Sequence, residues 1–68
     1  MANWKKTSEE LPESGVNVLF MLRNGDVIFG DWNDRSKEWW SDAFYEPEMH
    51  FPEEVIAWCP VPKYDINN

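Results

Sequence analysis

The sequence predicts a small, mainly β protein: an antiparallel meander of about four strands that can curl into a roll or partial barrel, with one long acidic loop. Three observations favour this fold class: runs of β-branched and aromatic residues, turn residues between those runs, and no sustained helical periodicity. A chain of 68 residues has room for a single domain. We assign this domain to residues 1–68, with a core at about 4–62 and a polar tail at 63–68.

Aromatic side chains have to supply most of the core, because a domain this short buries only about 60% of its unfolded surface. Five Trp, four Phe and two Tyr make 16% of the chain aromatic, and each ring can bury about 150–250 Å². Cys59 is the single cysteine, so no intrachain disulfide can form. We therefore expect large rings, rather than cross-links or metals, to hold the fold together.

The N-terminal stretch 4–12 is expected to be a short strand or extended lead-in, followed by a turn. A hydroxyl followed by carboxylates in Thr7-Ser8-Glu9-Glu10 can cap one turn of helix. Leu11-Pro12 ends this turn, because proline disfavours helical geometry in the residue before it.

The clearest local pattern is a β-hairpin between the runs 16–22 and 27–32. Asn24-Gly25 between them is typical of a type I′ turn, which places Phe20 opposite Phe29 and Leu22 opposite Val27. Met21 then lies opposite Ile28. The predicted faces are Val16, Val18, Phe20, Leu22, Val27 and Phe29 on one side and Leu19, Met21, Ile28 and Trp32 on the other. Because both faces are apolar, we expect the hairpin to be central and covered by the curling sheet, loops or chain ends.

The rest of the chain predicts two further strands separated by a long loop. Residues 37–40 follow a polar turn and pair back on the second strand. Residues 41–54 contain two prolines and no periodicity, which favours a loop, with one helical turn at 41–46 as the alternative. Residues 55–59 form the last strand, and Pro60-Val61-Pro62 closes it. We expect Trp4 and Trp58 to pack the chain ends together.

The chain resembles a known family at several points from residue 4 to 62. Trp4, Leu11-Pro12, the strand starting at Val16 and the ending Trp58-Cys59-Pro60-Val61-Pro62 are similar to the family called domain of unknown function 551. The ending is the most specific part, because the family usually has Trp, an apolar residue, Pro, an apolar residue and Pro there. The resemblance implies a bacteriophage, prophage or bacterial origin and a cytoplasmic setting, and it implies no activity.

One departure from the family lies directly before this ending. The family commonly has Thr-His before the Trp, and the chain has Ile56 and Ala57 instead. No role of that histidine is therefore carried over.

Charge excludes several classes of partner. Thirteen acidic and six basic residues give a net charge of −7, which repels nucleic-acid phosphates and anionic membrane surfaces. We expect neither direct nucleic-acid binding nor membrane binding, and the charge favours solubility and encounter with a basic protein surface. The N-terminus lacks a signal-peptide pattern and no segment is long enough to span a membrane, so we expect a cytoplasmic protein.

The sequence predicts no catalytic, cofactor-binding or metal site. Cys59 lies in a predicted buried strand and is expected to be a small apolar core residue. His50 is expected to be an ordinary loop histidine, with a pH-sensitive contact as the alternative. One His and one Cys at unrelated positions do not form a zinc site, and the three glycines are too dispersed for a phosphate-binding loop.

The loop 41–54 is strongly acidic and contains no Lys or Arg. In extended chain, Glu46 and Glu48 would project on one side about 6–7 Å apart, near the spacing of successive phosphates. Imitation of DNA, as in phage-encoded inhibitors of host defence, is one interpretation. The alternative is a solvated acidic loop that suppresses aggregation.

Aromatic residues surround this loop, and exposed aromatics are enriched at protein interfaces. Trp39 and Trp40 point to opposite faces of a strand, so at least one needs cover from a loop, a chain end or another molecule. The alternative is that the aromatics simply form the core. The candidate partner-binding residues are Trp39, Trp40, Asp42, Phe44, Tyr45, Glu46, Glu48, His50, Glu53 and Glu54.

Taken together, these patterns predict a small non-enzymatic interaction module of a phage or prophage that binds a host or phage protein. A homodimeric structural or accessory protein is the alternative. A small-molecule-binding protein or an enzyme ranks last, because no catalytic set is present, and such a function predicts a concave pocket with convergent polar groups.

Overall fold

The computed structural model describes residues 3–42 and 47–61 and confirms a mainly β architecture. Within these ranges the chain forms one six-stranded antiparallel sheet in the order β1-β6-β2-β3-β4-β5. Its elements are β1 (Lys5–Lys6), β2 (Asn17–Leu22), β3 (Val27–Asn33), β4 (Glu38–Ser41), β5 (Met49–His50), the 3-10 helix η1 (Pro52–Glu54) and β6 (Val55–Pro60). The four longer strands correspond to the four that the sequence predicts, and a two-residue strand adds to each edge.

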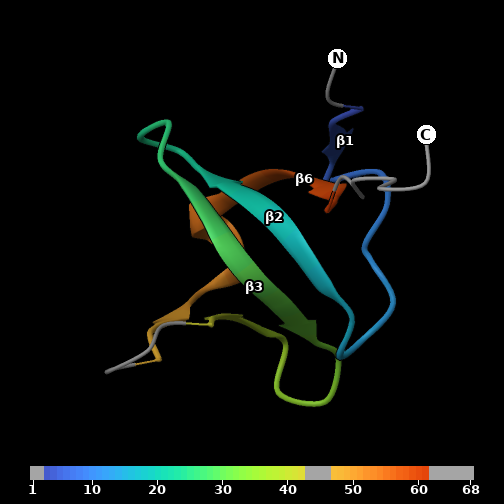
Figure 1. The fold of residues 1–68 in the computed structure, drawn as a ribbon, viewed down its shortest axis with the longest axis vertical. Coiled ribbons are helices and arrows are strands. Elements are labelled where there is room, and N and C mark those ends of the chain that lie inside the picture. Colours follow the sequence, from blue (N-terminus) through green and yellow to red (C-terminus); the bar gives the residue numbers. More distant parts are fainter. Residues whose placement is uncertain (1–2, 43–46, 62–68) are drawn as a thin grey trace, which may run out of the picture.

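The sheet is curled rather than flat. Strands β2 to β5 follow one another as a meander, and β6 then returns to pair with β2. In Figure 1, β2 and β3 run side by side across the front while β6 turns away behind β2. The sheet therefore has a concave inner face, which it partly encloses, and a convex outer face.

The β2–β3 hairpin has a different register from the predicted one, which was wrong by one residue. Leu19 lies opposite Phe29, Phe20 opposite Ile28 and Met21 opposite Val27. The Gly25 N–H donates to the Leu22 carbonyl oxygen at 2.9 Å. Since each pair shifts by one position, the side chains that share a face also change.

The shift has its cause in the turn. Gly25 has a φ of 96°, whereas Asn24 is not among the described residues with positive φ, so the turn is not type I′. The Leu22 N–H donates to the Asp26 carbonyl oxygen at 2.8 Å, which makes Arg23-Asn24-Gly25 a three-residue loop. This is the type I turn with a glycine bulge, the next most common hairpin after the two-residue loops.

The inner face holds the core, and four of its six fully buried members are aromatic. They are Val18, Phe20, Trp32, Trp39, Val55 and Trp58, with Leu22 and Ile28 packed against them. The ring centroid of Trp39 lies 5.0 Å from that of Phe20 and 5.1 Å from that of Trp32. The expectation of a mainly aromatic core is confirmed for the described residues.

The outer face carries the alternate residues of the same strands. In contrast to the predicted faces, Val27 and Phe29 share this side with Leu19 and Met21, while Ile28 and Trp32 lie on the inner side. The outer face includes the side chains of Leu19, Met21, Val27, Phe29, Asp31, Trp40, Met49, Ala57 and Cys59.

Residues 7–16, called the N-terminal strap below, extend from β6 to the end of β3. At one end the Trp58 indole N–H donates to the Glu10 carbonyl oxygen at 2.9 Å. At the other end the Gly15 N–H donates to the Trp32 carbonyl oxygen at 3.0 Å. Because the Trp58 indole is a core side chain, the first bond attaches the strap to the inner side of the sheet. The second bond joins main chain to main chain at the end of β3. The predicted helical turn is a single hydrogen-bonded turn in which the N–H groups of Glu9 and Glu10 donate to the Lys6 carbonyl oxygen.

The first and last strands, β1 and β6, pair with each other, whereas the packing of Trp4 against Trp58 stays a prediction. Lys5 in β1 lies opposite Trp58 in β6, and its Nζ lies 5.9 Å from the centroid of the Trp58 ring.

The predicted loop 41–54 contains two short elements that the sequence did not indicate, β5 and η1. The described residues include no helix with the length and apolar character needed to cross a bilayer.

Candidate partner-binding surface

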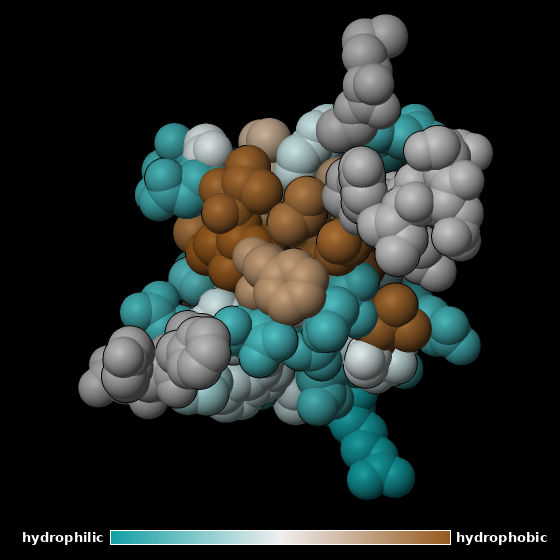
Figure 2. Space-filling view, in the orientation of Figure 1, coloured by the Kyte–Doolittle hydropathy of each residue, from teal (hydrophilic) through white to brown (hydrophobic). Residues whose placement is uncertain are grey.

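The outer face exposes a continuous set of large apolar side chains. Val27 is 50% exposed, Phe29 40% and Trp40 36%, and the half-buried Leu19 and Met21 lie beside them on β2. Figure 2 shows apolar side chains gathered over β2 and β3 on this side. Contiguous exposed apolar surface on a small protein typically marks an interaction site.

Two carboxylates lie within this apolar surface. Asp31 in β3 lies directly opposite Trp40 in β4. The Asp42 N–H donates to the Phe29 carbonyl oxygen at 2.9 Å, so the register continues past β4 and places Asp42 opposite Phe29. Neither carboxylate forms an ion pair with any residue in 3–42 or 47–61.

The two neighbouring tryptophans of β4 have opposite positions, as the sequence predicts. Trp39 lies on the inner face with 1% of its surface exposed, so it is a core residue and offers no surface to a partner. Trp40 lies on the outer face. Of this pair, only Trp40 remains a candidate for binding.

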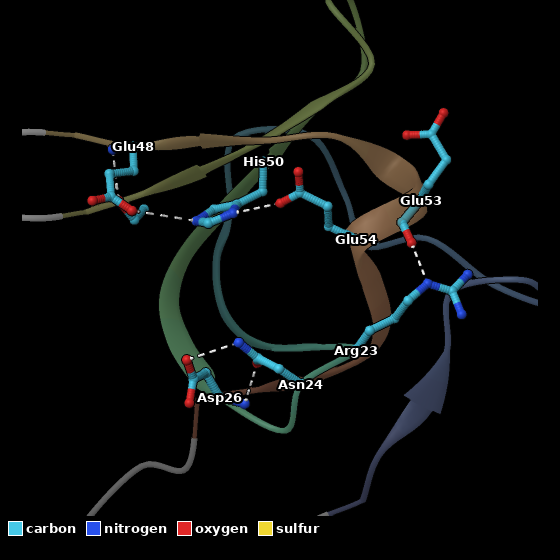
Figure 3. A network of polar contacts seen from close by, with 8 residues as sticks. Arg23, Asn24, Asp26, Glu48, His50, Glu53 and Glu54 are labelled. Carbon is cyan, nitrogen blue, oxygen red and sulfur yellow. Dashed lines mark hydrogen bonds and ion pairs between the residues drawn. The ribbon is translucent and has the colours of Figure 1, made fainter.

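His50 and two of the candidate glutamates form a separate polar cluster at the inner edge of the sheet. His50 Nδ1 lies 2.9 Å from Glu54 Oε2, and Nε2 lies 3.8 Å from Glu48 Oε2 (Figure 3). The His50 side chain is only 12% exposed, and its ring lies edge-on to Phe20 at 6.0 Å. The Glu48 N–H in turn donates to Ser41 Oγ at 2.8 Å. These contacts link β5 to η1 and to the core, which is a structural role.

Glu53 takes part in a second link, from η1 to the hairpin turn. Arg23 Nε donates to the Glu53 carbonyl oxygen at 2.8 Å (Figure 3). The Arg23 backbone N–H donates to the Glu54 carbonyl oxygen at 2.9 Å. The sequence did not indicate Arg23, because the bonds join residues 30 apart in the chain. Three further candidates, Phe44, Tyr45 and Glu46, lie outside the described residues.

A groove opens on the inner side, between the N-terminal strap and η1. It has a volume of about 730 Å³, and Trp32, Trp39 and Val55 form its floor. Its rim includes Leu11, Arg23, Pro52 and Ile56. Its lining contains neither His nor Cys, and the Thr7 hydroxyl in it already donates to the Val55 carbonyl oxygen at 2.8 Å. The groove can hold an apolar group, and its lining also includes the polar side chains of Lys6, Ser8 and Glu53.

The thiol and the possible metal-binding side chains of the described residues do not come together in one site. Cys59 is a free, buried thiol, as expected for a small apolar residue. No three His, Cys, Asp or Glu side chains in the described part of the chain are placed to hold a metal ion.

Sequence reasoning missed most of the outer face. Val27, Phe29 and Asp31 were not among the candidates, because the predicted hairpin register placed the two apolar residues beside Phe20. Recognising Arg23-Asn24-Gly25 as a three-residue loop would have placed Val27 and Phe29 beside Leu19 and Met21. Their position relative to Trp40 depends on the separate register of β3 and β4.

The comparisons with known proteins do not extend this description. No family model, curated protein or solved structure matches the chain. Membership of the family of domain of unknown function 551 therefore stays a prediction, and function has to be proposed from the geometry.

Proposed function

We propose that the protein is a non-enzymatic protein-binding module that uses the outer face of its sheet. One observation carries this proposal: Val27 and Phe29 are exposed side by side on β3, and the exposed Trp40 on β4 lies diagonally across from Phe29. Exposed aromatics that can be fully desolvated by a partner dominate the energetics of many protein interfaces. A rigid sheet also presents them without a large ordering cost on binding.

The partner is a protein with a basic contact surface. The chain has a net charge of −7, and Asp31 and Asp42 lie directly beside the exposed rings. Complementary charge accelerates encounter and excludes acidic partners. The resemblance of the chain to phage and bacterial proteins further favours a host or phage protein in the bacterial cytoplasm as the partner.

The experiment compares two exposed apolar residues on opposite sides of the molecule. Phe29→Ser alters the outer face, and Leu11→Ser alters the rim of the inner groove as the matched control, since the two side chains are 40% and 46% exposed. Each tagged variant is used to capture proteins from host and infected lysates at low and high salt. We expect Phe29→Ser alone to lose a salt-sensitive, basic partner.

The other outcomes separate the alternatives. Loss of the partner in Leu11→Ser alone would move the site to the groove. Retention in both variants, or no partner from either lysate, would contradict the proposal. Light scattering at micromolar concentration tests self-association, and a dimer that Phe29→Ser dissociates would assign the outer face to a second copy instead.

The groove supports a second candidate function, binding of a small apolar molecule. Its volume of about 730 Å³ lies within the range of small-molecule sites, about 300–1,000 Å³. Thermal-shift screening of small apolar compounds against the wild type and Leu11→Ser tests this candidate. A stabilising compound whose effect is lost in Leu11→Ser is expected if it is correct, and no such compound would count against it.

A further inference from the structure

The strongest unexplained feature of the outer face is an alternation of rings and carboxylates between β3 and β4. Phe29 and Asp31 are two residues apart on β3, so they point to the same side about 6.6 Å apart. Asp31 lies opposite Trp40, and Asp42 lies opposite Phe29. We call Phe29, Asp31, Trp40 and Asp42 the aromatic–acid square, since each ring has a carboxylate along its own strand and another directly across.

This pattern favours one class of side chain. A lysine ammonium or arginine guanidinium is attracted to the face of a Trp or Phe ring and to a carboxylate. A purely apolar group would cover Asp31 and Asp42 and leave both carboxylates desolvated without a partner, which is unfavourable. An acidic group would be repelled. A cationic side chain with an apolar stem satisfies both kinds of neighbour and also neutralises the charge of the carboxylates.

The cations of the described chain are placed elsewhere. Lys5 lies near Glu10 and the Trp58 ring, and Lys37 pairs with Asp34 at 3.0 Å. Arg23 is bonded to the Glu53 carbonyl oxygen. Lys6 contributes to the lining of the inner groove, and β6 and β2 separate its strand from β3, a distance of roughly 14 Å at the usual strand spacing. Among residues 3–42 and 47–61, no lysine or arginine forms an ion pair with Asp31 or Asp42, and this includes Arg35 in the turn between β3 and β4. Within this part of the chain the square is therefore open to a cation of another molecule.

We propose that the aromatic–acid square seats a lysine or arginine side chain of the protein partner. This inference rests on the proposed function of the outer face. The apolar neighbours of the seated cation would pack on Val27 and Met21, which lie opposite each other beside the square. A foreign basic partner fits better than a second copy, because each copy has a net charge of −7.

The test uses short peptides of defined charge and the full chain. Ac-Val-Arg-Val-NH₂ is titrated into the ¹⁵N-labelled protein, and the same peptide with neutral, isosteric citrulline in place of arginine is the reference. We expect the arginine peptide to shift the amide signals of the square and the Trp40 indole signal. The citrulline peptide should bind at least about threefold more weakly, as expected for loss of an exposed cation–π contact and ion pairing.

Variants that remove the charge of one carboxylate then test where the cation of the peptide binds. Asp31→Asn and Asp42→Asn should each weaken the arginine peptide by roughly two- to fivefold and leave the citrulline peptide unchanged. Glu9→Gln on the exposed strap is the matched control, because it removes the same charge far from the square. The amide spectrum of each free variant verifies its fold.

Two results would overturn the inference. If arginine and citrulline peptides bind with equal affinity, or if Asp31→Asn behaves like Glu9→Gln, no cation seat exists, although the apolar face would still be tested by capture with Phe29→Ser. If the arginine peptide shifts other residues or none, the square is not a binding site. Dimer formation that Asp31→Asn weakens would assign the cation to a basic residue of a second copy and also contradict a foreign partner.

Discussion

The two faces of the sheet contain similar aromatic residues, which are buried on the inner face and exposed on the outer face. Trp39 and Trp40 are adjacent in the sequence, yet one is 1% exposed and the other 36%. Phe20 on β2 and Phe29 on β3 differ in the same way, at 0% and 40%. The contrast teaches that hydrophobicity alone does not define the core of a small β protein. The pleat separates adjacent side chains, and the curl of the sheet decides which side is enclosed.

The inner face is enclosed because two features act together. The curl brings β6, β2, β3 and β4 around a common interior. On that side the N-terminal strap is bonded to the Trp58 indole, and its Leu11 lines the same groove as Trp32 and Trp39. The convex outer face has no such cover over Val27 and Phe29. A polypeptide of 68 residues has little material for a second layer, so its outer rings remain available to another molecule.

The largest expected effect is the loss of stability when the buried Phe20 is truncated, in comparison with the exposed Phe29. Phe20→Ala should lower the free energy of unfolding by about 3–5 kcal/mol, because it leaves a cavity between core rings. That loss is comparable to the total stability of about 3–10 kcal/mol for a domain of this size. Phe29→Ala should change it by less than about 1 kcal/mol. Urea denaturation followed by Trp fluorescence measures both, and equal losses would abolish the contrast between the faces.

The next largest expected effect is the destabilisation caused by adding a side chain at Gly30, which packs closely against β4 and Phe20. A Cβ at this position would clash with the Trp40 carbonyl oxygen and lie 2.9 Å from Phe20 Cε1. Gly30→Ala should therefore destabilise the protein by about 1–3 kcal/mol. Gly25→Ala meets no atoms but has a φ of 96°, and it should cost about 1 kcal/mol from backbone strain alone. A larger loss for Gly25→Ala in denaturation experiments would contradict this steric assignment.

A third comparison sharpens the role of the N-terminal strap. Trp58→Phe removes the hydrogen bond from the indole to the Glu10 carbonyl oxygen, and we expect a loss of about 1–2 kcal/mol. Hydrogen exchange of the Gly15 amide should accelerate if the whole strap loosens. Trp40→Phe on the outer face is the control, with an expected change within about 0.5 kcal/mol. Similar losses for both variants would show that the strap is not held by this bond.

The smallest expected effect is a change in the pKa of Asp34, which lies on neither face but in the turn between β3 and β4. The Lys37 ammonium, by a hydrogen bond and by its charge, holds the pKa of Asp34 below its ordinary value. A lowered carboxyl pKa stabilises the fold above the ordinary value, and this stabilisation is lost as the pH falls through the lowered one. Lys37→Met should return the pKa of Asp34 toward its ordinary value in an NMR titration. Because the pair is fully exposed, high salt should weaken the effect, and an unchanged pKa in Lys37→Met would contradict the assignment.

The sequence predicted the strands well and their pairing less well. The runs around Phe20 and Phe29 are β-branched and aromatic, which marks them as strands in any register. Their register depended on the turn, and Asn24-Gly25 suits both a two-residue loop and the last two positions of a three-residue loop. Periodicity could not decide between them, because Ile28 and Phe29 are both apolar.

The candidate site was predicted in part for related reasons. Trp40 and Asp42 were identified from composition and position. Phe29 and Asp31 were missed, because their neighbours come from a different strand and follow only from the register. The bond between Arg23 and Glu53 joins residues remote in sequence, and no local pattern marks such a contact. The strand β5 has only two residues, which is too short to show alternation.

Both edge strands of the sheet, β1 and β5, have only two residues. Amyloid growth adds one β-strand after another to a long, unprotected row of backbone amides and carbonyls. Here that row is short at each side, and at β1 it carries the charged pair Lys5–Lys6, a combination that discourages further strand addition. The protein can therefore expose aromatic side chains on its outer face at high concentration without a ready template for fibril formation.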